Sequence, residues 1–258
     1  MNVMRREKDL SVKKMVIVAM LGAITVVLGL TPLGFVPIGP LNATTMHIPV
    51  LIGAILEGPV VGGLVGLIFG LSSLFNAITR PTPISFVFYN PLISIVPRIL
   101  LGVLSGLLFE ALRKREDKNI KTIVNILWGI IILFLGIGLY RGVTGGKSGY
   151  MISLNIVFLL LSLGTAYMMN RKLQSNLAVM VSAFAGTLLH SLMVMGGIYF
   201  FFAERYLQAF DPPISMEAAR TTIFGVILTS GVPEGILAVI IVSAVVAAMK
   251  GKYPKLGR

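Results

Sequence analysis

The stretch SVKKMVIVAMLGAITVVLGL, residues 11–30, decides the fold class because its apolar run is long enough to cross a bilayer. A helix of about 20 apolar residues spans roughly 30 Å of hydrocarbon. Similar runs recur along the 258-residue chain, of which 56% is hydrophobic and only 12% is charged, whereas a soluble domain is about 25% charged. Alternating decamers typical of a transmembrane β-barrel do not occur in it. The sequence therefore predicts an all-α integral membrane protein, and the first run is too long for a cleaved signal peptide.

The apolar runs predict about eight helices in a single membrane domain, residues 1–258. The expected helices cover residues 11–30, 47–57, 59–78, 91–113, 120–140, 151–169, 176–201 and 221–249. With a cytoplasmic N-terminus, most of the 22 Lys and Arg residues fall on the cytoplasmic side, which is the distribution that membrane proteins favour. We therefore expect both termini inside the cell. The net charge of +12 then reflects topology and contact with anionic lipid rather than nucleic acid binding.

The stretch RGVTGGKSGY, residues 141–150, resembles a phosphate-binding loop but lies in the wrong context. That motif needs a strand before it and a glycine where Arg141 stands. The stretch instead joins two expected helices on the outer face, where ATP is scarce. We interpret it as a glycine-rich turn. The chain also has no cysteine, which excludes thiolate metal sites and cysteine nucleophiles.

Ionisable residues within the expected spans are the strongest candidates for a functional site, because a charge in lipid costs several kcal/mol. Arg98 and Glu234 can form a structural ion pair, or Arg98 can anchor a ligand carboxylate through a two-pronged hydrogen bond. Both interpretations hold if the ligand rearranges the pair. His190 is either a hydrogen-bonded packing residue or a ligand contact.

Polar side chains near the outer ends of the helices are further candidates. His47 begins a helix, and the segment before it supplies either a helix cap, from Thr44 or Thr45, or a polar rim over a pocket. Amide, aromatic and basic residues of the outer loops either form an interfacial belt or line a small-molecule pocket beside Arg98. These loop candidates are Asn42, Thr44, Asn76, Arg80, Tyr89 and Asn90. His47, His190 and Glu234 lack the spacing of a zinc motif, so we expect no metal site and no cofactor.

Four pieces of sequence occur in an order that is typical of one family. They are AMLGA, with Ala19 and Ala23 four residues apart, then HIPVLIGAILEGPVVGGLVGLIFG, then TPISFVFYNPLISIVPRILLGVLSGLL, and finally SGVPEGILAVIIVSAVVAAM. In this order they resemble the substrate-binding S component of energy-coupling factor (ECF) vitamin transporters. The resemblance covers residues 11–113 and 174–250.

The resemblance implies a six-helix core over residues 11–113 and 174–250 in a prokaryotic cell membrane, with both termini cytoplasmic. Residues 114–173 then form an inserted helix pair. An S component has no enzymatic activity of its own; it binds a vitamin near the outer face and joins a membrane T component and two cytosolic ATPases. Ala19 and Ala23 are expected to pack against the T component.

Within this family the chain is similar to the branch of pantothenate and riboflavin carriers. Arg98 favours a carboxylate ligand such as pantothenate. The only tryptophan, Trp128, lies in the inserted pair, which argues against a flat aromatic ligand held by tryptophan. Two other classes stay open: a self-sufficient secondary transporter, which should show inverted repeats, and an intramembrane enzyme using His190 and Glu234 as acid and base.

Overall fold

The computed structural model describes residues 11–38, 41–113, 118–145, 149–171, 177–208 and 227–249. Within these ranges it contains eight helices of 11 to 32 residues. They are α1 (Val12–Leu30), α2 (His47–Glu57), α3 (Pro59–Thr79), α5 (Val96–Leu112), α6 (Lys118–Thr144), α7 (Gly149–Arg171), α8 (Leu177–Gln208) and α10 (Val232–Met249). Shorter helical segments are η1 (Pro32–Gly34), η2 (Ser85–Tyr89), α4 (Pro91–Ser94) and η4 (Ile227–Gly231).

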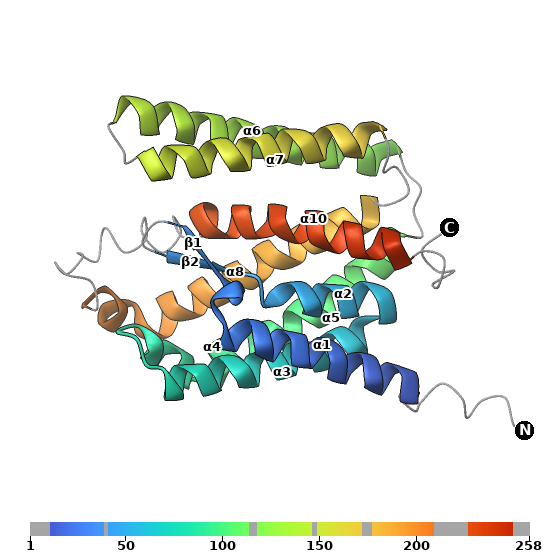
Figure 1. Cartoon of the computed structure of the whole chain (residues 1–258), viewed down its shortest axis with the longest axis vertical. Helices are drawn as coiled ribbons and strands as arrows, with labels where there is room; N and C mark the ends of the chain where they lie inside the picture. Colours follow the sequence, from blue (N-terminus) through green and yellow to red (C-terminus); the bar gives the residue numbers. More distant parts are fainter. Residues whose placement is uncertain are drawn as a thin grey trace, which may run out of the picture.

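Five stretches of this helical fold are long and apolar enough to cross a membrane. They are Val12–Leu30, Pro59–Thr79, Pro91–Leu112, Leu177–Tyr206 and Val232–Met249, and three shorter apolar helices lie in α2, α6 and α7. The prediction of a helical membrane protein is confirmed. Figure 1 shows the long helices running side by side, with the start of α1 and the end of α10 at the same end of the bundle.

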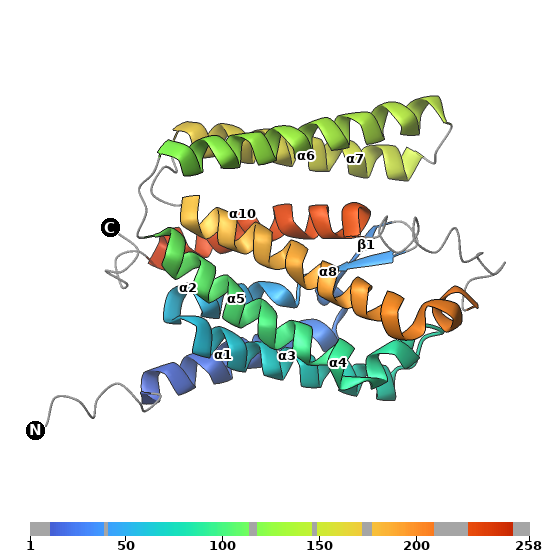
Figure 2. The same ribbon diagram turned by 180° about the vertical axis from the view of Figure 1, so that it is seen from behind.

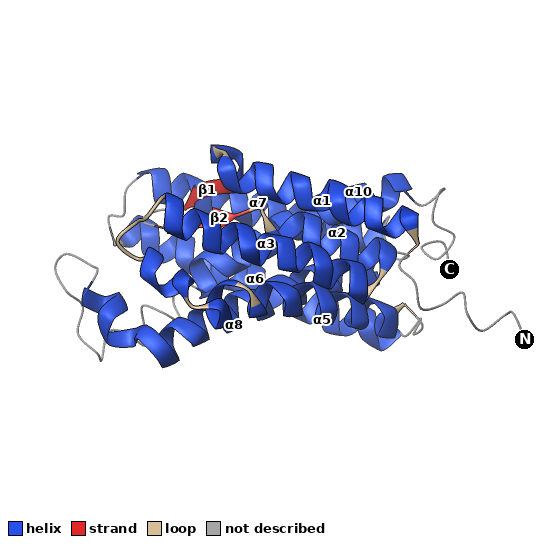
Figure 3. Cartoon of the chain, turned by 90° about the horizontal axis from the view of Figure 1, so that it is seen from below, coloured by secondary structure: helices blue, strands red, loops and turns tan. Residues whose placement is uncertain are grey.

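The segment after α1 contains a small β-hairpin where the sequence indicated only a loop. Strand β1 (Phe35–Ile38) pairs antiparallel with β2 (Leu41–Thr44), and Phe35 lies opposite Thr44. The hairpin pairs backbone amides and carbonyls that would otherwise need other hydrogen-bond partners. Figure 3 shows it at one end of the bundle, beside the start of α2.

The break between α2 and α3 is where the sequence indicates it. Gly58 closes α2 with a φ of 100°, a conformation that residues with a Cβ rarely adopt, and Pro59 opens α3 at its first turn. By contrast, the expected cap of α2 by Thr44 or Thr45 is wrong. Met46 precedes the helix without a side-chain cap, and the Thr45 hydroxyl donates to the Leu33 carbonyl instead.

Helices α3 and α5 pack backbone to backbone. A Cβ added to Gly62 would lie 2.7 Å from the Gly102 carbonyl oxygen, and one added to Gly66 would collide with the Arg98 carbonyl. Small residues allow such close approach in membrane bundles, where dispersion contacts replace the hydrophobic effect as the driving force. This contact sets the position of the Arg98 backbone.

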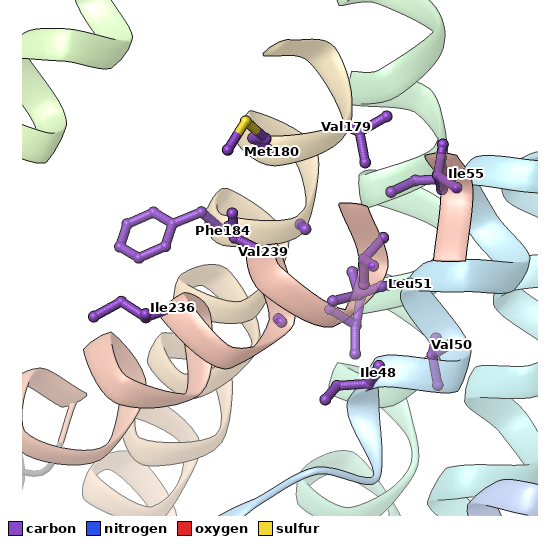
Figure 4. Packing of buried hydrophobic residues seen from close by; sticks show 14 of the residues in the cluster. Ile48, Val50, Leu51, Ile55, Val179, Met180, Phe184, Ile236 and Val239 are labelled. Carbon is purple, nitrogen blue, oxygen red and sulfur yellow. The ribbon is translucent and has the colours of Figure 1, made fainter. Parts of the chain in front are cut away.

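The apolar core lies between α2, α8 and α10, and Figure 4 shows Leu51, Phe184, Ile236 and Val239 among its side chains. Helices α6 and α7 form a pair along the α10 side of the bundle (Figure 1). The pair joins the core through Trp128, which is 4% exposed and whose ring centroid lies 5.5 Å from that of Phe184. Figure 2 shows α8 crossing the bundle obliquely, from α10 towards α4.

Candidate functional site

Four ionisable side chains come together inside the bundle, each from a different helix. His47 is the first residue of α2, Arg98 lies in the first turn of α5, His190 lies inside α8, and Glu234 lies in the first turn of α10. Their exposed fractions are 1%, 5%, 6% and 7%. Because burying such groups costs several kcal/mol without compensation, their meeting at one place marks this cluster as the candidate site.

The Arg98 guanidinium lies between two phenylalanine rings. Its central carbon is 5.3 Å from the ring centroid of Phe69 on α3 and 5.5 Å from that of Phe88 in η2. Such cation–π contacts stabilise a desolvated cation and fix the plane of the guanidinium. One terminal nitrogen donates to the Ile93 carbonyl, while Nε is buried and has no partner in the described part of the chain. Arg98 is thus held in one orientation, and its Nε–H group remains available to donate a hydrogen bond.

The Glu234 carboxylate ties α10 to the hairpin. Its Oε1 accepts a 2.7 Å hydrogen bond from the backbone amide of Thr44, and the Ser191 hydroxyl also hydrogen-bonds this side chain. Arg98 and Glu234 attract each other electrostatically but form no direct ion pair among the described residues. The Ile93 carbonyl and the two rings, rather than Glu234, hold the guanidinium.

The two histidines lie face to face. Their ring centroids are 6.5 Å apart with planes 16° from parallel, and Phe69 lies 5.9 Å from His190. Neither ring nitrogen of His190 has a hydrogen-bond partner among the described residues. The His47 ring lies near the Thr44 and Glu234 backbones, in a geometry too poor for a regular hydrogen bond. Buried polar atoms in native proteins almost always have partners, so the unpartnered His190 nitrogens beside an unsaturated arginine make this cluster the candidate site for a polar ligand.

Several other predicted site residues connect helices near the hairpin end. Asn76 donates from Nδ2 to the Gly29 carbonyl at 3.1 Å, and Arg80 donates to the Leu30 carbonyl at 3.0 Å, so both hold the end of α1 against α3. These contacts account for the Arg80 side chain and for the Asn76 amide nitrogen, whereas Asn76 Oδ1 is buried without a partner among the described residues. Their roles in binding stay predictions.

The remaining residues predicted from the loops do not lie together in the structure. Asn90 caps α4, with its Oδ1 accepting the Leu92 amide at 3.0 Å. Tyr89 is 48% exposed. The Thr44 backbone reaches the site through Glu234, while the Asn42 side chain lies outside what the structure describes. The structure therefore brings together His47, Arg98, His190, Glu234 and the Thr44 amide.

Two side chains of the site were not singled out from sequence. Phe69 lies in an apolar helix, where one phenylalanine looks like any other core residue. The glycines on either side of it could have identified it. Gly66 and Gly70 lie on the face of α3 that approaches Arg98 and Ile95, and Phe69 lies between them in the sequence. Ser191 adjoins His190 but has no pattern of its own.

Ala19 and Ala23 lie on the outward face of α1. Both are exposed, whereas Leu21, Gly22 and Thr25 face the bundle. Only 22% of the apolar stretch of α1 is buried inside the bundle, whereas 50% to 56% is buried in the other four membrane-spanning helical stretches. Helix α1 therefore lies at the edge of the bundle and presents a surface of small and apolar side chains.

The described residues contain no group of three His, Asp or Glu side chains placed to bind a metal ion. The cluster instead combines one guanidinium, one carboxylate and two imidazoles, all suited to hydrogen bonds. This set can bind a small anionic molecule that also carries hydroxyl or amide groups.

Comparison with known proteins agrees with this chemistry. The family model for the ECF transporter, substrate-specific component, matches residues 13–248. A pantothenic acid transporter, PanT, of Lactococcus lactis is 29% identical over 119 residues, which cover 41% of this chain and 61% of the relative. A pantothenate transporter, PanT, of Leuconostoc mesenteroides is 34% identical over 113 residues, which cover 43% of this chain and 55% of the relative. The chain thus spans less than two thirds of the length of these curated relatives.

Proposed function

The chain belongs to the family of substrate-specific components of ECF transporters, and from this premise we propose that it binds pantothenate for uptake into the cell. It is a multi-pass protein of a prokaryotic cell membrane and a transport subunit rather than an enzyme. The names of the two relatives support pantothenate over riboflavin. Riboflavin or another vitamin is the alternative substrate.

The observation that carries the proposal is the Arg98 guanidinium, which is buried and oriented by two aromatic rings. Pantothenate has a carboxylate at one end and hydroxyl and amide groups along its length. Arg98 can bind the carboxylate with charge-assisted hydrogen bonds, which are about twice as strong as neutral ones. The ring nitrogens of His47 and His190 can then donate to, or accept from, the hydroxyl and amide groups.

The outward face of α1 supports the proposal that this chain docks on a membrane T component. Ala19 and Ala23 make the middle of this face shallow, between the exposed side chains of Val16 and Val27, so a partner helix can approach closely there. Energy for transport then comes from ATP hydrolysed by two cytosolic partner ATPases.

We further propose that α6 and α7 are an insertion, residues 114–173, in a six-helix core with both termini in the cytoplasm. The 119 residues matched in the Lactococcus relative make up 61% of it, so that relative is shorter than this 258-residue chain. The pair also packs on one side of the bundle, through α8 and α10. Both features fit a helix pair added to a six-helix core.

Calorimetry on the purified chain tests the proposed substrate. Pantothenate should bind with a Kd at or below micromolar, while riboflavin should not compete. Arg98→Ala should abolish binding, because the carboxylate loses its anchor, and Arg141→Ala, which removes an exposed arginine on α6, should leave Kd unchanged. Unchanged affinity in Arg98→Ala would exclude Arg98 as the anchor. Gradient-driven uptake by this chain alone in liposomes would indicate a secondary transporter instead.

A further inference from the structure

The buried cluster contains one arginine and one glutamate, so its permanent charges cancel. Arg98 is 5% exposed and Glu234 is 7% exposed, and the two attract each other without forming a direct ion pair. Glu234 accepts hydrogen bonds from the Thr44 amide and the Ser191 hydroxyl, and in the empty site its carboxylate is the counter-charge of Arg98. With both histidines uncharged, the site has no net charge.

A carboxylate ligand on Arg98 disturbs this balance. It brings a second negative charge into a site with a single fixed cation, which leaves a net charge of −1 surrounded by apolar side chains. An uncompensated buried charge costs several kcal/mol and is usually avoided by a change of protonation. A proton on one of the groups in the cluster restores neutrality.

We propose that the binding of a carboxylate ligand at Arg98 is coupled to the uptake of about one proton by Glu234. The inference rests on the proposed function. The proton comes from solvent and joins a Glu234 carboxylate oxygen, which converts the side chain to a neutral acid. Arg98 then has the ligand as its counter-charge, and Glu234 can still accept the Thr44 amide. The glutamate thus serves as counter-charge in the empty site and yields that role to the ligand.

The other ionisable groups around Glu234 compete for the proton. Arg98 on α5 is already charged, which leaves His47 on α2 and His190 on α8 as the alternatives within the cluster. Strand β2 and η4, which also contact α10 or its neighbours, have no ionisable residue. Helix α7 also packs against α10, but its described ionisable side chain, Tyr167, is 63% exposed and lies outside the buried cluster.

Glu234 is a better acceptor of this proton than His47 or His190. Protonating a histidine beside Arg98 would place two cations and two anions in one buried site, whereas protonating Glu234 leaves a single ion pair. Fewer buried charges mean a smaller desolvation cost. The Glu234 carboxylate is also the charge that repels the incoming ligand.

Proton uptake is measured by titrating the full chain with pantothenate in two buffers of different ionisation enthalpy. At about pH 8, wild-type protein should take up about one proton per ligand, and Kd should rise roughly tenfold per pH unit. Glu234→Gln should bind with no net proton exchange and a flat pH profile, because the amide is already neutral. Glu204→Gln, which removes an exposed carboxylate of α8, should behave as wild type.

Two further measurements separate the possible failures. Pantothenyl alcohol, which has a hydroxyl in place of the carboxylate, should bind more weakly and without proton uptake. At saturating pantothenate, His190→Asn should retain the uptake of about one proton, and loss of that uptake would assign the proton to His190 rather than Glu234. Wild-type binding without proton exchange, or uptake that persists in Glu234→Gln, would overturn the inference while leaving the proposed substrate intact. Failure of wild-type protein to bind pantothenate would overturn the proposed function and this inference with it.

Discussion

Gly66→Ala tests whether the contact between α3 and α5 positions the binding site. The new methyl group would collide with the carbonyl of Arg98, which is a backbone atom and cannot move aside as a flexible side chain can. The two helices must therefore separate. Overpacking of this kind costs about 1–3 kcal/mol, and for a chain of this size each kcal/mol lowers Tm by about 2–4 °C.

Gly129→Ala is the matched control for this prediction. Gly129 is also inside a helix, but a Cβ built there meets no atom within 4 Å. Because alanine is a better helix former than glycine, this variant should be neutral or stabilised by up to about 1 kcal/mol. The two variants make the same chemical change, so their difference isolates the helix contact.

Thermal unfolding in detergent and calorimetry with pantothenate give the two readouts. Gly66→Ala should lower Tm and also weaken binding at temperatures well below Tm, because the displaced carbonyl belongs to the proposed anchor residue. A Gly66→Ala protein with the Tm of Gly129→Ala and wild-type affinity would refute the reasoning. A lower Tm with unchanged Kd would show that the contact stabilises the bundle without setting the geometry of Arg98.

Three further predictions concern the site, the docking face and the helix pair. Phe69→Leu removes one of the two rings on Arg98, a contact worth about 0.5–2 kcal/mol, so calorimetry should show a Kd several-fold to about thirtyfold weaker; an unchanged Kd would contradict the stacking role. Ala23→Leu should leave pantothenate binding intact but reduce uptake by cells that have the coupling module, and wild-type uptake would argue against docking through α1. Trp128→Ala should lower the free energy of unfolding by about 3–5 kcal/mol by leaving a cavity between α6 and α8, and a change below about 1 kcal/mol would show that the pair packs loosely.

The buried cluster was predictable from sequence because membrane proteins seldom retain ionisable residues inside their spans. Arg98, His190 and Glu234 stand out in apolar runs, and His47 stands at the start of one. The break at Gly58 was predictable for a similar reason, since glycine followed by proline ends one helix and begins another.

The connections between these residues could not be read from sequence. The Thr44 partner of Glu234 is a backbone amide, which every residue except proline has. Asn76 and Arg80 have the polar character of ligand contacts, but their partners are carbonyls at the end of α1, and only tertiary packing decides that. The hairpin was missed because its strands are only four residues long and carry no clear alternation.

The hydrogen bond between Thr44 and Glu234 joins residues 190 positions apart, and this separation sets when the site can form. At a synthesis rate of roughly 5–20 residues per second, Glu234 emerges from the ribosome about 10–40 s after Thr44. Arg98 emerges 136 residues before Glu234, so for about 7–27 s it has no Glu234 carboxylate to balance its charge. The cluster is therefore completed by the last helix, so a chain halted before α10 would contain most of the protein's mass and still lack one of the four buried ionisable side chains.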